Sequence, residues 1–318
     1  MKPAIVGIAG PVLQPDEAAC LRAKTPLGVI LFARNIENPV QLATLVAALR
    51  AWLPAALLMV DQEGGRVARL RPPHWRAHPP ARALHTVRAA WLTGALIGIE
   101  CAAAGFDLVA APVLDVAAPD GHDVIGDRSF SDDPAQVAAL GGAFAAGLLA
   151  AGIQPIGKHV PGHGRARADS HLELPVLDDV AAADLHPFTA NRMLPWLMTA
   201  HIRYISHGML PATQNCDLIA GVIRGSLGFD GLLITDDLAM QALAGTPGER
   251  AAQALQAGCD VALHCSGILA DTQDVLAALP DAAAQCLARL AAAAAMARAA
   301  RQVLDGDALA AERADLLG

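Results

Sequence analysis

Polar and ionisable side chains gather in one short stretch of this largely apolar chain, residues 158–171, which reads KHVPGHGRARADSH. The stretch follows an apolar run at residues 153–156. Lys158 and His159 are therefore expected where a buried strand ends and the chain opens to solvent. Catalytic groups of parallel barrels are mounted at such strand ends. The stretch thus predicts an active-site loop.

The same loop contains a pair of residues suited to proton transfer. Pro161, Gly162 and Gly164 interrupt regular structure, so the chain can turn here and approach a ligand closely. Asp169 and His171 follow, two residues apart, and can face each other across a tight turn. A carboxylate that accepts from one ring nitrogen leaves the other nitrogen to exchange a proton with a substrate. The pair predicts a general acid/base, which needs a nucleophile beside it.

Candidates for that nucleophile lie in the segment GLLITDDLAM. Successive side chains of a strand point to opposite faces, so Asp236 and Asp237 are predicted to point in different directions. Only one of the two can then face a substrate. The alternative is that both aspartates cap the segment that follows.

Charged residues also follow two other apolar runs. Asp61 comes after LLMV and opens DQEGGRVARL, where paired glycines allow a tight turn before Arg69. The alternative is that Asp61 caps a helix and Arg69 is a solvated surface residue. The run DLVAAPVLDV contains Asp115, which we interpret as structural support, and leads to Arg128. Arginine offers a planar set of donors suited to several hydroxyls or to a carboxylate.

The motifs KH, PGHG and DSH, in this order, resemble the signature of the family 3 glycoside hydrolases, and most closely that of the bacterial β-N-acetylhexosaminidases. The segments DQEGGRV, IGDRSF and TDDLAM occur in the order of the family. The resemblance therefore extends over nearly the whole chain. It departs from the usual pattern after PGHG, where the family usually has Asp-Thr and this chain has Arg165 and Ala166.

The resemblance implies a role for each of these residues. It assigns the nucleophile to the first aspartate of TDDLAM, Asp236, and leaves Asp237 to anchor the backbone. His171, oriented by Asp169, would then be the acid/base of a retaining double displacement. The substrate implied is a terminal β-linked N-acetylglucosamine on a cell-wall muropeptide fragment. The residues expected to bind the sugar are Asp61, Arg69, Arg128, Lys158 and His159.

The alternation of elements predicts the fold. The chain has 318 residues, 54% of them hydrophobic, which suits one domain over residues 1–318. About eight short apolar runs alternate with helical patterns, as in a single (β/α)8 TIM-type barrel. A doubly wound open sheet is the alternative, but its glycine fingerprint is absent. Strands are expected at 4–10, 28–32, 57–60, 106–111, 154–157, 196–200, 232–234 and 261–264, and helices at 40–52, 82–104, 134–151, 249–257 and 281–304.

Charge and cysteine usage limit the partners and the compartment. The net charge is -8 and the basic residues are scattered, so neither nucleic acid nor an anionic membrane is expected as a partner. The six cysteines form no CxxC pair, which favours free thiols in a reducing compartment. The N-terminus lacks a secretory cleavage pattern. We therefore expect a cytoplasmic protein that binds a small molecule. The resemblance implies that this molecule is a saccharide, and we expect the protein to be a monomer without a cofactor.

Three alternatives stay open. A metal-dependent barrel hydrolase is one, although proline and glycine between two of its histidines exclude the helix that makes their spacing productive in zinc sites. A non-catalytic sugar-binding barrel is another, because Arg165 and Ala166 depart from the family pattern. A phosphorylase that uses phosphate in place of water is the third. The metal ligands would be His159, His163, His201 and Asp236; otherwise His163 is expected to hold the loop and His201 to lie near the site or in the core.

Overall fold

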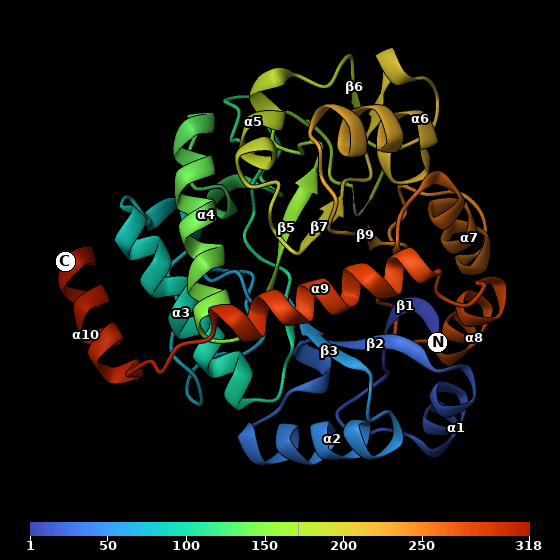
Figure 1. Cartoon of the computed structure of the whole chain (residues 1–318), viewed down its shortest axis with the longest axis horizontal. Coiled ribbons are helices and arrows are strands. Elements are labelled where there is room, and N and C mark those ends of the chain that lie inside the picture. The colour runs from blue at the N-terminus through green and yellow to red at the C-terminus, as the bar shows by residue number, and fades with distance from the viewer. Residues whose placement is uncertain (171) are drawn as a thin grey trace.

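The structure is a computed structural model that describes residues 1–170 and 172–318. In this described part, eight parallel strands form a closed barrel (Figure 1). The strand β1 pairs with both β2 and β10, so the sheet closes on itself. The predicted TIM-type barrel is confirmed, and the open sheet is excluded. The barrel strands are β1 (Lys2–Gly7), β2 (Pro26–Leu31), β3 (Leu57–Val60), β4 (Leu108–Val109), β5 (Gln154–Val160), β7 (Trp196–Thr199), β9 (Leu232–Asp237) and β10 (Val261–His264).

Helices alternate with these strands and surround the barrel (Figure 1). A short parallel pair, β6 (Val176–Leu177) and β8 (Arg203–Tyr204), lies outside the barrel sheet. The helices are α1 (Pro15–Lys24), α2 (Pro39–Trp52), α3 (Val87–Ala103), α4 (Pro134–Ala150), α5 (Ala182–Ala190), α6 (Cys216–Leu218) with the π-helical segment Ile219–Ser226, α7 (Pro247–Ala257), α8 (Leu269–Ala278), α9 (Ala284–Ala300) and α10 (Gly306–Leu317).

Capping residues in the sequence fix where several helices begin and end. The side chains of Asn38, Asp133 and Thr246 accept backbone N–H groups in the first turns of α2, α4 and α7. Each of these helices has proline at its start. A backbone N–H at this position would have no acceptor within the helix, so proline, which lacks the N–H, costs no hydrogen bond there. Gly258 ends α7 with a φ of 116°, which favours glycine.

Two predicted helix ranges are wrong. The helix expected from residue 82 begins at Val87, because Thr86 caps it after a short 3-10 turn at Ala81–Ala83. The helix expected at 281–304 is shorter, α9 at Ala284–Ala300, and a further helix, α10, begins beyond the predicted range at Gly306. The chain leaves α9 in an extended conformation at Arg301. The Gln302 N–H then donates to the Ala150 carbonyl oxygen, and Asp305 caps α10.

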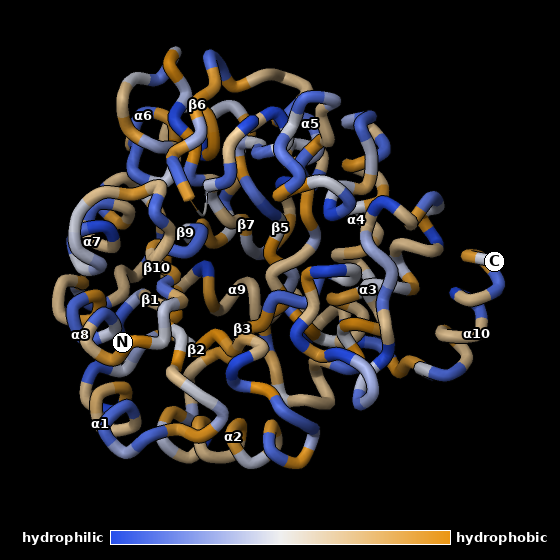
Figure 2. Tube along the Cα trace, turned by 180° about the vertical axis from the view of Figure 1, so that it is seen from behind, coloured by the Kyte–Doolittle hydropathy of each residue, from blue (hydrophilic) through white to orange (hydrophobic). Residues whose placement is uncertain are grey.

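Apolar residues fill both the barrel interior and the layer between strands and helices. Hydrophobic segments lie in the central strands β2 and β3, and hydrophilic segments lie in the outer helices and in the loops (Figure 2). Inside the barrel the buried Trp196 donates from Nε1 to Gln154 Oε1 over 2.8 Å. In the described part of the chain, no helix combines the length and apolarity needed to cross a membrane.

Helix α9 packs at the amino end of the barrel. Its Arg289 contacts Asp230 and Asp260, which lie just before β9 and β10. Arg289 Nη1 lies 2.9 Å from Asp260 Oδ1. Because this end is covered, the carboxyl ends of the strands are where a ligand can enter.

Candidate active site

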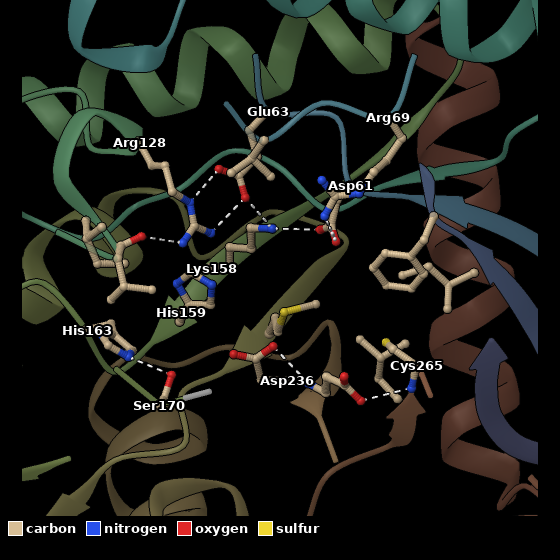
Figure 3. Close-up of a pocket in the computed structure, with 18 residues that line it drawn as sticks. Asp61, Glu63, Arg69, Arg128, Lys158, His159, His163, Ser170, Asp236 and Cys265 are labelled. Atoms are coloured by element: carbon tan, nitrogen blue, oxygen red, sulfur yellow. Dashed lines mark hydrogen bonds and ion pairs between the residues drawn. The ribbon is translucent and has the colours of Figure 1, made fainter. Parts of the chain in front are cut away.

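A pocket lies at the carboxyl ends of the barrel strands, and both charged or polar side chains and apolar ones line it (Figure 3). Six of the predicted site residues lie together in it: Asp61, Arg69, Arg128, Lys158, His159 and Asp236. They come from β5, β9 and the loops that follow β3 and β4. Residues far apart in the sequence therefore share one surface, as the strand-end argument predicted.

The two aspartates of β9 point in different directions, as predicted. Asp237 Oδ1 accepts from the backbone N–H groups of Ala239 and Cys265, both over 2.9 Å. Asp236 Oδ1 accepts from the Asp237 N–H over 2.8 Å, and both aspartates lie in the pocket lining. Asp237 thus holds the backbone at the end of β9 and β10, and Asp236 is presented to a ligand.

The electrostatic surroundings keep Asp236 ionised. Burial alone would raise its pKa, but the imidazoles of His159 and His201, the backbone N–H of Asp237 and the Lys158 ammonium together lower the pKa to about 2. A carboxylate must be ionised to attack an electrophilic carbon. Asp236 therefore meets the electrostatic requirement for a nucleophile at neutral pH.

Beside Asp236, three basic and two acidic side chains form a connected ion-pair network (Figure 3). Lys158 Nζ lies 3.0 Å from Asp61 Oδ1 and 2.6 Å from Glu63 Oε1. Arg128 donates from Nε and Nη2 to both oxygens of Glu63, each over 2.8 Å. Arg69 Nη2 lies 3.3 Å from Asp61 Oδ2. The network fixes the donors of the pocket before a ligand arrives.

Glu63 was not predicted as a site residue, but it lines the same pocket as Asp236. Burial would raise its pKa, but Arg128 and Lys158 hold the pKa of Glu63 well below its usual range. Glu63 therefore stays ionised and is unsuited to donate a proton. Glu63 is directed into the pocket by the turn that follows it, where Gly64 has a φ of 98° and a Cβ would lie 2.3 Å from the Pro79 carbonyl oxygen.

Replacing Glu63 with glutamine is expected to lower the free energy of unfolding by about 3–5 kcal/mol, because two buried cations lose their shared counter-charge. Urea unfolding at neutral pH measures this loss. The matched control is Asp127→Asn, which removes the exposed Arg66–Asp127 pair and should cost less than about 1 kcal/mol. Since the pKa of Glu63 is lowered in the folded state, its contribution is lost only as the pH falls below the ordinary glutamate range. Similar losses for both variants would contradict the network's role.

A second buried cluster supports the loop that follows β5. His159 Nδ1 lies 2.6 Å from Asp115 Oδ2, and Asp115 Oδ1 accepts from the backbone N–H groups of His159 and His163. Asp115 is fully buried, so its interpretation as structural support is confirmed. Lys158 and His159 lie inside β5 and are buried. The expectation that they sit where the chain opens to solvent is wrong, because β5 runs on to Val160.

His163 joins the two ends of the active-site loop. Its Nε2 lies 3.0 Å from Ser170 Oγ, and its backbone N–H is held by Asp115. Burial lowers the pKa of His163 to about 4, although the carboxylates of Asp115 and Asp236 oppose this shift. The ring is therefore neutral at pH 7. These contacts match its predicted loop-holding role.

The departure from the family pattern after PGHG leaves the loop closely packed. Ala166 is buried, its N–H donates to the His163 carbonyl oxygen, and its own carbonyl oxygen accepts from His122 N–H. Asp169 is half-buried, next to Ser170 of the pocket lining. His171 lies outside the described residues, so the Asp169–His171 pair stays a prediction.

The four metal ligands suggested by the sequence are all described, and they are not arranged as a ligand set. His201 Nε2 donates to the Asp237 carbonyl oxygen over 3.0 Å, and its Nδ1 lies 2.7 Å from Thr213 Oγ1. Burial lowers the pKa of His201. Across residues 1–170 and 172–318, no three His, Cys, Asp or Glu side chains are grouped so as to hold a metal ion.

A TIM barrel with an ionised aspartate among hydrogen-bond donors at its carboxyl end has the architecture of a glycoside hydrolase. Residues 12–304 match the glycosyl hydrolase family 3 N terminal domain. The chain belongs to this family, and within it to the β-hexosaminidase group. The resemblance drawn from KH, PGHG and DSH is confirmed.

Relatives agree in sequence and in structure. A β-hexosaminidase of Tolumonas auensis is 42% identical over 283 residues, which cover 84% of this chain and 83% of the relative. The structure of NagZ from Neisseria gonorrhoeae, in complex with N-trifluoroacetyl-D-glucosamine, superposes with a TM-score of 0.87 at 32% identity and covers 100% of this chain and 98% of that one. A family 3 β-N-acetylglucosaminidase from Paenibacillus sp. str. FPU-7 has the same TM-score at 30% identity. The match covers 95% of this chain but only 62% of the Paenibacillus chain.

Proposed function

We propose that this chain is a retaining exo-β-N-acetylglucosaminidase that removes terminal β-linked N-acetylglucosamine from peptidoglycan fragments. The observation that carries the proposal is Asp236, an ionised carboxylate in the pocket that also holds Asp61, Lys158 and Arg128. The β-hexosaminidase relatives and the N-acylglucosamine derivative bound by the Neisseria protein support the substrate class.

In the first step, a carboxylate oxygen of Asp236 attacks the anomeric carbon, and the glycosidic carbon–oxygen bond breaks. The departing oxygen takes a proton from His171, whose imidazolium is supported by the charge of Asp169. Glu63 is unsuited to give this proton, because its pKa is held well below its usual range. The product of the step is a glycosyl ester on Asp236.

In the second step, water replaces Asp236 at the anomeric carbon. His171, now neutral, takes a proton from the water while the ester bond to Asp236 breaks. The carboxylate and the imidazolium are both restored. Two inversions at the same carbon give net retention of the β configuration.

The ion-pair network provides the contacts to the sugar. Lys158 and Arg128 offer only donors, while Asp61, at 18% side-chain exposure, keeps carboxylate surface open to the pocket. A hydroxyl that donates to Asp61 and accepts from Lys158 satisfies both groups at once. Arg69, whose guanidinium carbon lies 5.4 Å from the centroid of the Phe32 ring, and His159 complete the proposed binding set.

Substitution of these residues tests the proposed contacts. Asp61→Ala, Lys158→Ala and Arg128→Ala are each expected to lower kcat/KM for an aryl N-acetylglucosaminide by about tenfold to over a hundredfold, as loss of one hydrogen bond to a charged group does. Steady-state kinetics measure this, with Arg88→Ala as a control because Arg88 pairs with Glu312, and neither residue lines the pocket. Parent-like kinetics in all three variants would place the sugar elsewhere.

Turnover of a chromogenic N-acetylglucosaminide tests the function itself. Release of free N-acetylglucosamine in phosphate buffer supports hydrolysis, whereas release of its 1-phosphate would identify a phosphorylase. Binding without turnover would identify a non-catalytic barrel.

We further propose that one domain of residues 1–318 carries the activity and that the protein acts on muropeptides as a cytoplasmic monomer.

A further inference from the structure

Arg165, in the active-site loop, makes contacts that the proposed chemistry does not use. Its Nε donates to Asp184 Oδ2 over 2.6 Å, and its Nη2 donates to the Asp179 carbonyl oxygen over 2.7 Å. Asp184 belongs to the first turn of α5 and its side chain is 5% exposed, while Arg165 is 33% exposed. A guanidinium thus connects the loop both to a helix and to the backbone of a later segment.

The same carboxylate lies against the backbone of the loop. Gly162 has a φ of 133°, and a Cβ there would lie 2.7 Å from the Asp184 Cβ. The Gly162 carbonyl oxygen accepts from the hydroxyl of Tyr204, which is fully buried, over 2.8 Å. Asp184 and Tyr204 therefore pack against the backbone of the loop, and Arg165 joins the loop to Asp184.

Arg165 closes the chain segment that contains the proposed acid/base pair. Its bond to the Asp179 carbonyl oxygen links residues 165 and 179, and Asp169 and His171 lie between them. Holding the ends of a chain segment together reduces the conformations open to the residues inside it. Proton transfer requires hydrogen-bond reach to the departing oxygen, so the freedom of this segment bears directly on rate.

We propose that Arg165 is a positioning residue for the proposed acid/base: its bonds to Asp184 of α5 and to the Asp179 carbonyl oxygen hold the loop so that Asp169, the predicted partner of the acid/base, stays next to the pocket. The inference rests on the proposed function. Burial raises the pKa of Asp184, and the charge of Arg165 opposes that shift. Both contacts therefore depend on the guanidinium of Arg165. Lysine keeps the positive charge but cannot donate to Asp184 and to the Asp179 carbonyl oxygen from one planar group, so it replaces arginine only in part.

A second arginine of the same loop offers a matched control. Arg167 pairs with Asp120, but the two side chains are 77% and 78% exposed. Exposed pairs of this kind contribute little. Arg167→Ala should therefore leave kinetics unchanged, although it removes the same charge two residues away from Arg165.

The test compares Arg165→Ala, Arg165→Lys and Arg167→Ala on two substrates. One is the β-1,4-linked disaccharide of N-acetylglucosamine, whose leaving group needs a proton; the other is the nitrophenyl N-acetylglucosaminide, whose leaving group does not. Arg165→Ala should lose about a hundredfold in kcat on the disaccharide. On the nitrophenyl substrate it should give a full burst of nitrophenol followed by slow turnover that azide accelerates. Arg165→Lys should fall in between.

Several outcomes would overturn the inference. A burst that shrinks in parallel with turnover means fewer folded molecules and a purely structural arginine. Parent-like kinetics of Arg165→Ala, or equal losses on both substrates, would also contradict the inference. If Arg165→Ala fails to fold, the double variant Arg165→Ala/Asp184→Asn replaces it, because it also removes the carboxylate that Arg165→Ala leaves unpaired. A loss on the disaccharide with a full burst on the nitrophenyl substrate would support the role of Arg165. Parent-like activity of the double variant on the disaccharide would refute it. Absence of turnover by the parent enzyme would instead refute the proposed function. If His171→Ala loses activity on the disaccharide but keeps the nitrophenol burst, and Arg165→Ala behaves like the parent, only the role of Arg165 is refuted.

Discussion

Asp236→Asn is expected to lower kcat by on the order of 10⁴- to 10⁶-fold, the range found when a catalytic nucleophile or a member of its catalytic unit is removed. The amide cannot form the glycosyl ester, so water would have to attack the anomeric carbon directly. The pocket should still bind the sugar, because the network of Asp61, Glu63 and Lys158 does not involve Asp236. Steady-state assays with an aryl N-acetylglucosaminide measure the loss.

The neighbouring aspartate is the control for this prediction. Asp237 accepts from the backbone of Ala239 and Cys265, so Asp237→Asn should mainly lower the free energy of unfolding, by about 1–3 kcal/mol. Its kcat per folded molecule should stay far above that of Asp236→Asn. The reverse order would assign the nucleophile to Asp237.

His171→Ala is expected to slow hydrolysis of the β-1,4-linked disaccharide by about 10²- to 10⁴-fold, the usual contribution of general acid–base catalysis. The same variant should form the glycosyl-enzyme from a nitrophenyl glycoside at nearly the parent rate, because nitrophenolate leaves without a proton. A burst and slow turnover follow, since the second step still needs a base. Stopped-flow absorbance measures both phases.

Two further variants sharpen the assignment. Asp169→Asn should fall between the parent and His171→Ala, because it keeps a partner for the ring but removes the charge that supports the imidazolium. Azide should accelerate turnover of His171→Ala, since it attacks the ester without base catalysis. Equal losses on both substrates, with no burst and no rescue, would make His171 structural and move the search to another group.

The pH dependence follows from the same assignment. The pKa of Asp236 is lowered to about 2, so the nucleophile stays ionised at every pH above that value and does not limit activity near neutrality. On the disaccharide, kcat/KM should fall as rising pH deprotonates the acid, His171. On the nitrophenyl glycoside this fall should be absent.

Much of the site was predictable because strand ends can be recognised in the sequence. Asp61 and Asp236 each complete an apolar run, and parallel strands bring such ends to one face of a barrel. The opposite directions of Asp236 and Asp237 followed from strand geometry alone. These inferences needed only local pattern and the closure of the sheet.

Glu63 could not be assigned in this way, because its role depends on partners far along the chain. Its carboxylate meets Arg128, 65 residues later, and Lys158 of β5. Its direction into the pocket depends on the turn at Gly64, which packs against Pro79. The same holds for the contacts of Arg165, because the sequence does not show that Asp184 and the Asp179 carbonyl lie beside it. The break between α9 and α10 likewise depends on the contact of Gln302 with Ala150.

The central claim is that Asp236 forms a covalent bond to the sugar, and trapping that ester tests it most directly. The enzyme would be incubated with a fluorinated N-acetylglucosaminide that carries a good leaving group. The fluorine slows both steps and the leaving group speeds only the first, so the ester accumulates. Proteolysis and mass spectrometry would then locate the added sugar. The account predicts one sugar per chain, on Asp236 in the peptide containing TDDLAM, and no label in Asp236→Asn. A sugar on Glu63 or Asp237, or full inactivation without any covalent label, would contradict it.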